Sequence, residues 1–174
     1  MKSESDLKDE FEQKINLARD SEEYYTLKAK ELGLKDFERI IKFFPNVSTN
    51  TKKGLVFAHN DFEKILQAIA NKKPWAVVSG LNPSGPLHFG HKAIFDELIW
   101  MQQNGAEVFI PITNDESYVV DKTQSLAESR RIAYEEVIPS IIAFGFDPAK
   151  THIYVDSDYL DIYNVAMDLS KKLT

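Results

Sequence analysis

Apolar residues near the start of the chain recur every three or four positions, which predicts one apolar helix face. The residues with this spacing are Leu7, Phe11, Ile15 and Ala18. Two further helices are predicted over 24–32 and 36–44, before the turn residues Gly33 and Pro45. The polar segment 45–54, PNVSTNTKKG, predicts a loop or linker. We therefore expect a helical N-terminal extension over residues 1–53.

From residue 54 the pattern changes to short, continuous apolar runs that alternate with helical periodicity. The runs typical of buried strands are 75–78, 107–112 and 153–155. Helical periodicity covers 61–70, 91–103, 125–144 with a kink expected at Pro139, and the residues from 157 onward. This strand–helix alternation predicts an α/β fold over 54–174, with a Rossmann-like parallel sheet and helices on both of its faces. Ligands bind such sheets beyond the carboxyl ends of the strands, so we expect the site in the loops after Val78, Ile112 and Val155.

The loop after the first predicted strand, GLNPSGPLHFGH (80–91), is the richest in candidate chemistry. Its glycines permit close approach to a ligand, and its prolines stiffen the chain. His88 and His91 are three positions apart at a helix start, where both imidazoles and the unpaired N–H groups can face a phosphate. The alternatives are that the histidines only cap or pack the helix, or that they bind an adventitious metal. Neither a G-x-G-x-x-G nor a P-loop pattern is present.

Composition narrows the functional classes. The chain has 174 residues, a net charge of −6 and no cysteine, so disulfides are excluded. The acidic balance argues against high-affinity nucleic-acid binding by the whole chain, although it does not exclude a local anion site. No apolar stretch is long enough for a membrane span, and the acidic start resembles neither a signal nor a transit peptide. We expect a cytoplasmic protein.

PSGPLHFGH (83–91) resembles the first signature of class I aminoacyl-tRNA synthetases, the "HIGH" motif, which reads HFGH at 88–91. The P-S-G upstream of that motif is similar to the tyrosyl and tryptophanyl branch. Three other segments look like those of archaeal and eukaryotic tryptophanyl enzymes. They are FAHNDF (57–62), TNDE (113–116) and FGFD followed by KT (144–151). The resemblance covers residues 54–174.

The resemblance implies that tryptophan is activated with Mg²⁺-bound ATP and then transferred to tRNA(Trp) by a full-length, homodimeric enzyme. It implies catalytic roles for two residues, His88 and His91. ATP-binding positions would be Gly80, Asn82, Pro83, Ser84, His88, Gly90 and His91. Amino-acid-binding positions would be Val78, Pro111 and Glu116, with Glu116 near the substrate ammonium; the alternative for Glu116 is a solvated loop cap. No resident metal site is expected.

Two departures from the family pattern leave more than one function open. In the eukaryotic type a Tyr and a Gln hold the indole nitrogen at the positions of Val78 and Pro111, which cannot accept that hydrogen bond. A tyrosyl enzyme therefore remains an alternative. The second class I signature, the "KMSKS" loop, does not occur in the sequence, so we expect an N-terminal portion of a longer enzyme. An H-x-G-H nucleotidyltransferase and a non-catalytic fragment that only binds nucleotide also stay open.

Overall fold

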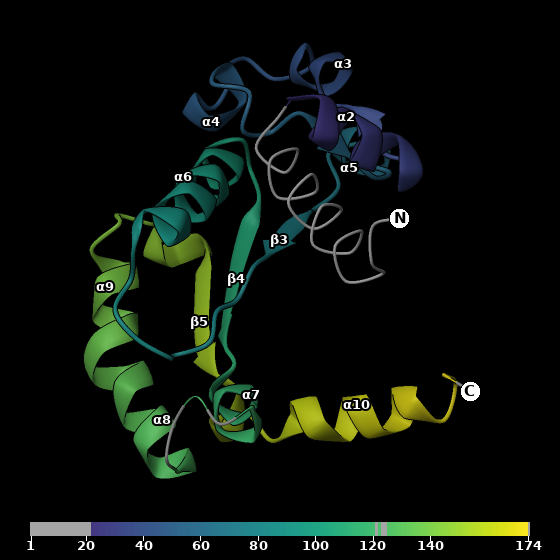
Figure 1. Ribbon diagram of the computed structural model, residues 1–174. Helices are drawn as coiled ribbons and strands as arrows, with labels where there is room; N and C mark the ends of the chain where they lie inside the picture. Colours follow the sequence, from purple (N-terminus) through teal and green to yellow (C-terminus); the bar gives the residue numbers. More distant parts are fainter. Residues whose placement is uncertain (1–21, 121, 123–124, 174) are drawn as a thin grey trace, which may run out of the picture.

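The computed structural model describes residues 22–120, 122 and 125–173 (Figure 1). The helix predicted around Leu7 and Ala18 lies outside these residues. The N-terminal elements are α2 (Glu22–Glu31), β1 (Lys35–Asp36), α3 (Glu38–Ile41), α4 (Thr49–Lys52), β2 (Ala58–His59) and α5 (Glu63–Ala70).

Two N-terminal predictions were wrong, both because of hydrogen bonds that the apolar pattern does not show. The helix expected over 36–44 is shorter, because Asp36 pairs with Ala58 in a two-stranded antiparallel sheet, β1–β2, and its Oδ1 accepts from the Glu38 N–H at 2.8 Å. The segment expected to be a loop contains α4, whose N-cap Ser48 accepts from the Thr51 N–H at 3.0 Å. Short polar side chains favour both kinds of turn because they bond the nearby backbone.

The remaining elements form the predicted α/β unit. Its strands are β3 (Ala76–Val78), β4 (Glu107–Ile112) and β5 (Thr151–Val155). Its helices are α6 (Phe89–Gln103), α7 (Asn114–Val119), α8 (Leu126–Ile132), a π-helical turn η1 (Ala133–Val137), α9 (Ile138–Ile142), the 3₁₀ turns η2 (Pro148–Lys150) and η3 (Asp156–Asp158), and α10 (Asp161–Ser170). The strands are parallel and ordered β3-β4-β5, which confirms the Rossmann-like sheet.

Helices cover one face of this sheet. Val108, Ile110 and Ile112 of β4 are fully buried there, in a core that also includes residues of α6, η1 and α9. In Figure 1, α6 and α9 stand on this side, and α10 extends away from the sheet. On the other face Val78 is 64% exposed and His152 is also exposed. The expectation of helices on both faces is therefore not met within the described residues.

The long helix predicted over 125–144 is interrupted where a kink was expected. The π-helical turn η1 lies immediately before Pro139 in α9. Proline has no N–H and its ring crowds the preceding turn, so the helix widens instead of continuing regularly. The Ser140 hydroxyl donates to the Glu136 carbonyl at 2.6 Å and gives that oxygen a partner. The helix is thus irregular at the position of the predicted kink, where a π-helical turn replaces a regular turn.

A second apolar cluster attaches the N-terminal elements to α6. Phe37, Ile40, Phe44 and Trp100 are buried together, and the Trp100 indole donates to the Asn46 carbonyl at 2.9 Å. Burial of one such aromatic side chain stabilises the folded state by about 1.5–3 kcal/mol. Residues on both sides of position 53 join this cluster, and the domain boundary at 53/54 stays a prediction.

Candidate functional site

The loop between β3 and α6 is anchored to the sheet before it reaches the histidines. Beyond Val78 the backbone stays paired with β4, as Leu81 N–H donates to the Pro111 carbonyl at 3.1 Å. The Thr113 N–H in turn donates to the Leu81 carbonyl at 3.0 Å. The Pro83 side chain is fully buried and Leu87 packs on the core. Buried apolar groups therefore position a loop whose polar residues remain accessible.

Gly80 is required by the approach of this loop to β4. A Cβ at this position would lie 2.5 Å from the Pro111 carbonyl oxygen and 2.7 Å from Pro111 Cγ. Neither atom belongs to a flexible side chain, so a side chain at 80 would push the loop off the strand. This gives Gly80 a structural reason that is independent of any ligand.

The two histidines cap α6 reciprocally. His88 is the N-cap residue, and its Nδ1 accepts from the Gly90 N–H at 3.2 Å. His91 Nδ1 accepts from the His88 N–H, also at 3.2 Å. The two ring centroids are 4.0 Å apart. The structure thus bears out the expectation that both imidazoles lie together, and it also confirms that they act as helix caps.

This capping selects the tautomer of each neutral imidazole. Because Nδ1 accepts a hydrogen bond, the ring proton must reside on Nε2, which can donate to another group. Burial and the neighbouring His88 ring lower the pKa of His91 below its usual value. The pair therefore offers two Nε2–H donors beside the N-terminus of a helix, whose dipole favours an anion.

The His88 ring limits the size of the residue at position 90. A Cβ at position 90 would lie 3.0 Å from His88 Cε1 and 3.1 Å from its Nδ1. A side chain there would force the His88 ring to shift by a few tenths of an ångström. The H-x-G-H spacing is thus explained locally, since the glycine lets the first histidine fold back on the helix.

Asn82 joins the loop to the segment after β4. Its carboxamide contacts the Thr113 hydroxyl. In the orientation that matches donors with acceptors, its nitrogen lies 3.0 Å from the Thr113 carbonyl oxygen and 3.1 Å from Glu116 Oε2. Its oxygen then lies 3.2 Å from Lys122 Nζ. Two residues that the sequence placed in different subsites, Asn82 and Glu116, are therefore direct neighbours.

The carboxyl ends of β4 and β5 are tied together by Asn114, which is fully buried. Its amide donates to the Ser157 hydroxyl at 2.9 Å, and its oxygen accepts from the Ser157 N–H at 3.1 Å. The Ser129 hydroxyl donates to the Asn114 carbonyl at 2.6 Å. Asn114 therefore has a structural role, because its side chain joins the ends of two strands.

The same edge is acidic. Burial, followed by the charges of Asp115 and Glu116, raises the pKa of Asp156, whose Oδ1 has no hydrogen-bond partner. Burial and a 2.7 Å hydrogen bond to Asp115 raise the pKa of Tyr163 to about 12. Such an edge favours a cationic group over an anionic one.

Val78 and Pro111 lie on the exposed face of the sheet. Val78 pairs with Phe109 in the register, and Phe109 stacks on His152 with centroids 4.5 Å apart. A cavity of about 560 Å³ on this face is lined by Phe109, Thr151, His152, Ile153, Tyr154 and Tyr159. The structure brings together three groups of predicted site residues: His88 with Gly90 and His91, Asn82 with Glu116, and Gly80 with Pro111. Among the described residues, the hydrogen bonds of the histidine pair do not extend to Asn82 or Glu116.

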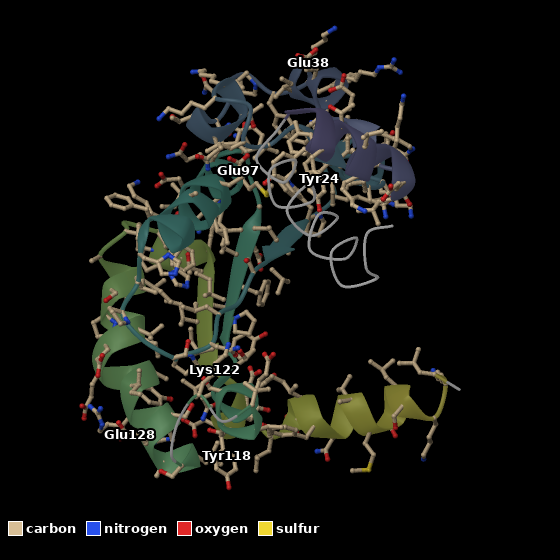
Figure 2. The ribbon with its side chains drawn as sticks, in the orientation of Figure 1. Tyr24, Glu38, Glu97, Tyr118, Lys122 and Glu128 are labelled. Atoms are coloured by element: carbon tan, nitrogen blue, oxygen red, sulfur yellow. The ribbon has the colours of Figure 1, made fainter. Side chains whose placement is uncertain are left out.

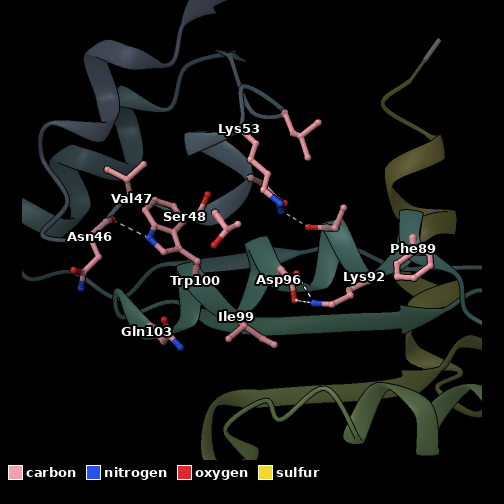
Figure 3. Close-up of a pocket in the computed structure, with 14 residues that line it drawn as sticks. Asn46, Val47, Ser48, Lys53, Phe89, Lys92, Asp96, Ile99, Trp100 and Gln103 are labelled. Carbon is pink, nitrogen blue, oxygen red and sulfur yellow. Dashed lines mark hydrogen bonds and ion pairs between the residues drawn. The ribbon is translucent and has the colours of Figure 1, made fainter.

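A further cavity of about 880 Å³ lies between α4 and α6 (Figure 3). It is lined by Asn46, Val47, Ser48, Thr49, Asn50, Lys53, Leu55, Phe89, Lys92, Ala93, Asp96, Ile99, Trp100 and Gln103. None of the residues predicted for the site lines it. Its nearest link to the histidines is Phe89, which is 89% exposed.

Sequence reasoning missed Thr113 as a contact of Asn82, and it missed Lys122. Lys122 belongs to no motif, and only its position six residues after Glu116 could have drawn attention to it. The described residues hold no group of three or more His, Cys, Asp or Glu side chains arranged for a metal ion. In the part of the chain that the structure describes, no helix has the length and apolar character to cross a bilayer.

Comparison with known proteins gives this geometry a family context. The family described as tRNA synthetases class I (W and Y) matches residues 70–174. A tryptophan–tRNA ligase of Pyrobaculum arsenaticum is 36% identical over 148 residues, which cover 84% of this chain and 39% of the relative. The tryptophan–tRNA ligase of Methanocaldococcus jannaschii is 34% identical over 148 residues, which cover 85% of this chain and 40% of the relative.

A solved structure is also similar to this chain. The crystal structure of tryptophanyl-tRNA synthetase from Aeropyrum pernix K1 matches with a TM-score of 0.77 and 34% identity, covering 88% of this chain and 43% of that one. The chain thus spans about two fifths of the length of the relatives it matches. The family match over most of the α/β unit, together with the H-x-G-H helix cap, shows that the chain belongs to the class I tRNA synthetases of the W and Y group.

Proposed function

We propose that this chain carries the ATP-binding part of a tryptophan–tRNA ligase. The observation that carries the proposal is the reciprocal capping of His88 and His91, which leaves two Nε2–H donors at the start of a 15-residue helix. The names of the relatives support tryptophan as the amino acid. The complete protein would use Mg²⁺-bound ATP and tRNA(Trp), act as a homodimer, and work in the cytoplasm, where translation takes place.

In the proposed reaction the tryptophan carboxylate attacks the α-phosphorus of ATP, and the bond to pyrophosphate breaks. The products are tryptophanyl-adenylate and pyrophosphate, and the acyl group then passes to the 3′ end of the tRNA. Such phosphoryl chemistry depends on positioning and charge stabilisation rather than on covalent help. His88 and His91 would donate to phosphate oxygens, where negative charge increases in the transition state.

The remaining predicted residues take supporting roles in this proposal. Gly80, Pro83 and Ser84 would shape the ATP-binding loop, and Asn82 would link it to the amino-acid site. Glu116 would accept from the substrate ammonium at the acidic edge of the sheet. Val78 and Pro111 would contact the aromatic side chain from the exposed sheet face.

The test is amino-acid-dependent exchange of labelled pyrophosphate into ATP by the 174-residue chain, with tryptophan, with tyrosine and without amino acid. Exchange with tryptophan alone is the expected result. Exchange with tyrosine alone would move the chain to the tyrosyl enzymes of the same family. No exchange with either would contradict activation by this chain, while its family membership would stand.

A further inference from the structure

We infer that Lys122 binds the carboxylate of the amino-acid substrate, as the counterpart of Glu116, which binds its ammonium. The inference rests on the proposed function, because it assigns a residue to that same site. It starts from the carboxamide of Asn82, which contacts Glu116 Oε2 at 3.1 Å on its nitrogen side and Lys122 Nζ at 3.2 Å on its oxygen side. The Glu116 carboxylate and the Lys122 ammonium thus lie on the two sides of one amide group.

That arrangement matches an α-amino acid. The substrate carries an ammonium and a carboxylate on the same carbon, so its two charges are also separated by a few bonds. The substrate ammonium would bind Glu116 and the substrate carboxylate would bind Lys122, on the two sides of Asn82. Hydrogen bonds between charged groups are stronger than those between neutral groups. Asn82, whose side chain also contacts Thr113, would set the spacing between the two protein groups.

The charge of the surroundings requires such a cation. Burial raises the pKa of Asp156, and the negative charges of Asp115 and Glu116 at this edge raise it further. A substrate carboxylate entering here would be repelled unless a positive group received it. The guanidinium of Arg130 is already paired with Asp158 at 2.8 Å.

Lys122 is available for this role. Its ammonium has three donors, and the contact to the Asn82 oxygen uses one of them. Among the described residues, no carboxylate forms an ion pair with it. Figure 2 shows Lys122 near α7, beside the carboxyl end of β4.

The experiment compares L-tryptophan with L-tryptophanamide, which keeps the ammonium and replaces the carboxylate with a neutral amide. Ligand-observed NMR on the 174-residue chain measures both dissociation constants into the millimolar range. In Lys122→Met we expect the affinity for tryptophan to fall by about tenfold or more, and the affinity for tryptophanamide to stay unchanged. Lys122→Arg should keep most of the preference, and Lys42→Met, which removes an exposed lysine at the end of α3, should change neither constant.

Different failures point to different conclusions. Equal losses for both ligands in Lys122→Met would show that the lysine only holds the loop, and would overturn the inference. Unchanged binding of both ligands would overturn it as well, while the proposed function would stand. If the unmodified chain bound neither ligand, the proposed amino-acid site itself would be wrong, and the inference would fall with it.

Discussion

Each histidine at the start of α6 has two ring nitrogens with separate tasks. Nδ1 accepts from a backbone N–H at the start of α6, and Nε2 keeps a proton that it can donate to another group. A helix cap needs only a short acceptor, whereas a phosphate contact needs the reach and the N–H of the imidazole. Substitution can therefore separate the capping of α6 from the proposed contact with phosphate.

His88→Ser should keep the helix cap and remove the proposed phosphate contact. Serine is a good N-cap, so we expect the free energy of unfolding to change by less than about 1 kcal/mol. Tryptophan-dependent pyrophosphate exchange should fall by about 10²- to 10³-fold, because a donor to the transition state is lost. His88→Ala should lose both stability and exchange. Unchanged exchange in His88→Ser would show that His88 is a cap alone.

Gly80→Ala should destabilise the fold without removing any polar group. The new Cβ would lie 2.5 Å from the Pro111 carbonyl oxygen, so the loop must move away from β4. We expect a loss of roughly 1–3 kcal/mol, as is usual for overpacking in a close contact. Urea unfolding measures it, with Ser79→Ala as the neighbouring control. A loss no greater than in the control would mean that the loop yields at little cost.

At the scale of elements, α4 holds α6 in place through the side chain of Asn50. The Asn50 amide donates to the Ala93 carbonyl at 2.6 Å and contacts Glu97 Oε2 at 3.4 Å. Glu97 is only 9% exposed, and its other oxygen has no partner. Burial raises the pKa of this carboxyl, with a further contribution from Asp96. A buried carboxylate therefore lies within the contact that orients the helix bearing the histidines.

Glu97→Gln should remove a pH dependence of stability. The unfolded chain loses the Glu97 proton near pH 4.5, but the folded chain keeps it to higher pH. Between these values the unfolded state binds fewer protons, so the free energy of unfolding of the wild type falls as pH rises. We expect the free energy of unfolding of the wild type, relative to that of Glu97→Gln, to fall as the pH rises from 4.5 towards neutrality. Below pH 4.5 this difference should stay constant. A constant difference between the two proteins in urea unfolding across this range would contradict the expectation.

At the scale of the whole molecule, apolar surface remains exposed on α10. Its residues Ile162, Val165 and Leu169 fall on one helix face, and Val165 and Leu169 are 57% and 51% exposed. The sheet face around Val78 is also open within the described residues. Exposed apolar surface of this kind promotes association.

We therefore expect the 174-residue chain to self-associate, and Leu169→Glu to weaken that association. The substitution places a charge in the apolar face of α10, whereas Asn164→Glu adds the same charge on the opposite face and should have little effect. Sedimentation velocity at several protein concentrations measures the difference. Equal sedimentation of both variants would mean that α10 takes no part in association.

Much of the fold could be predicted because the local pattern and the final structure agree. The run 107–112 became β4 with the expected bounds, and Pro139 produced the expected break through a fixed property of its ring. The N-terminal segments were harder. Side-chain bonds from Asp36 and Ser48 decide where α3 and α4 begin, and such bonds compete with periodicity over only a few residues.

The sequence by itself determined the strand–helix alternation of the α/β unit, the family, and the loop that carries the two histidines, because periodicity and motif spacing are local properties of the chain. Only the tertiary structure decided that the rings of His88 and His91 both cap α6, that Gly80 must clear Pro111, and that Lys122 meets Glu116 across Asn82. Contacts such as Asn82 with Glu116 join residues more than thirty positions apart. Their distances depend on how the strand ends align in the sheet, and no local pattern encodes that alignment.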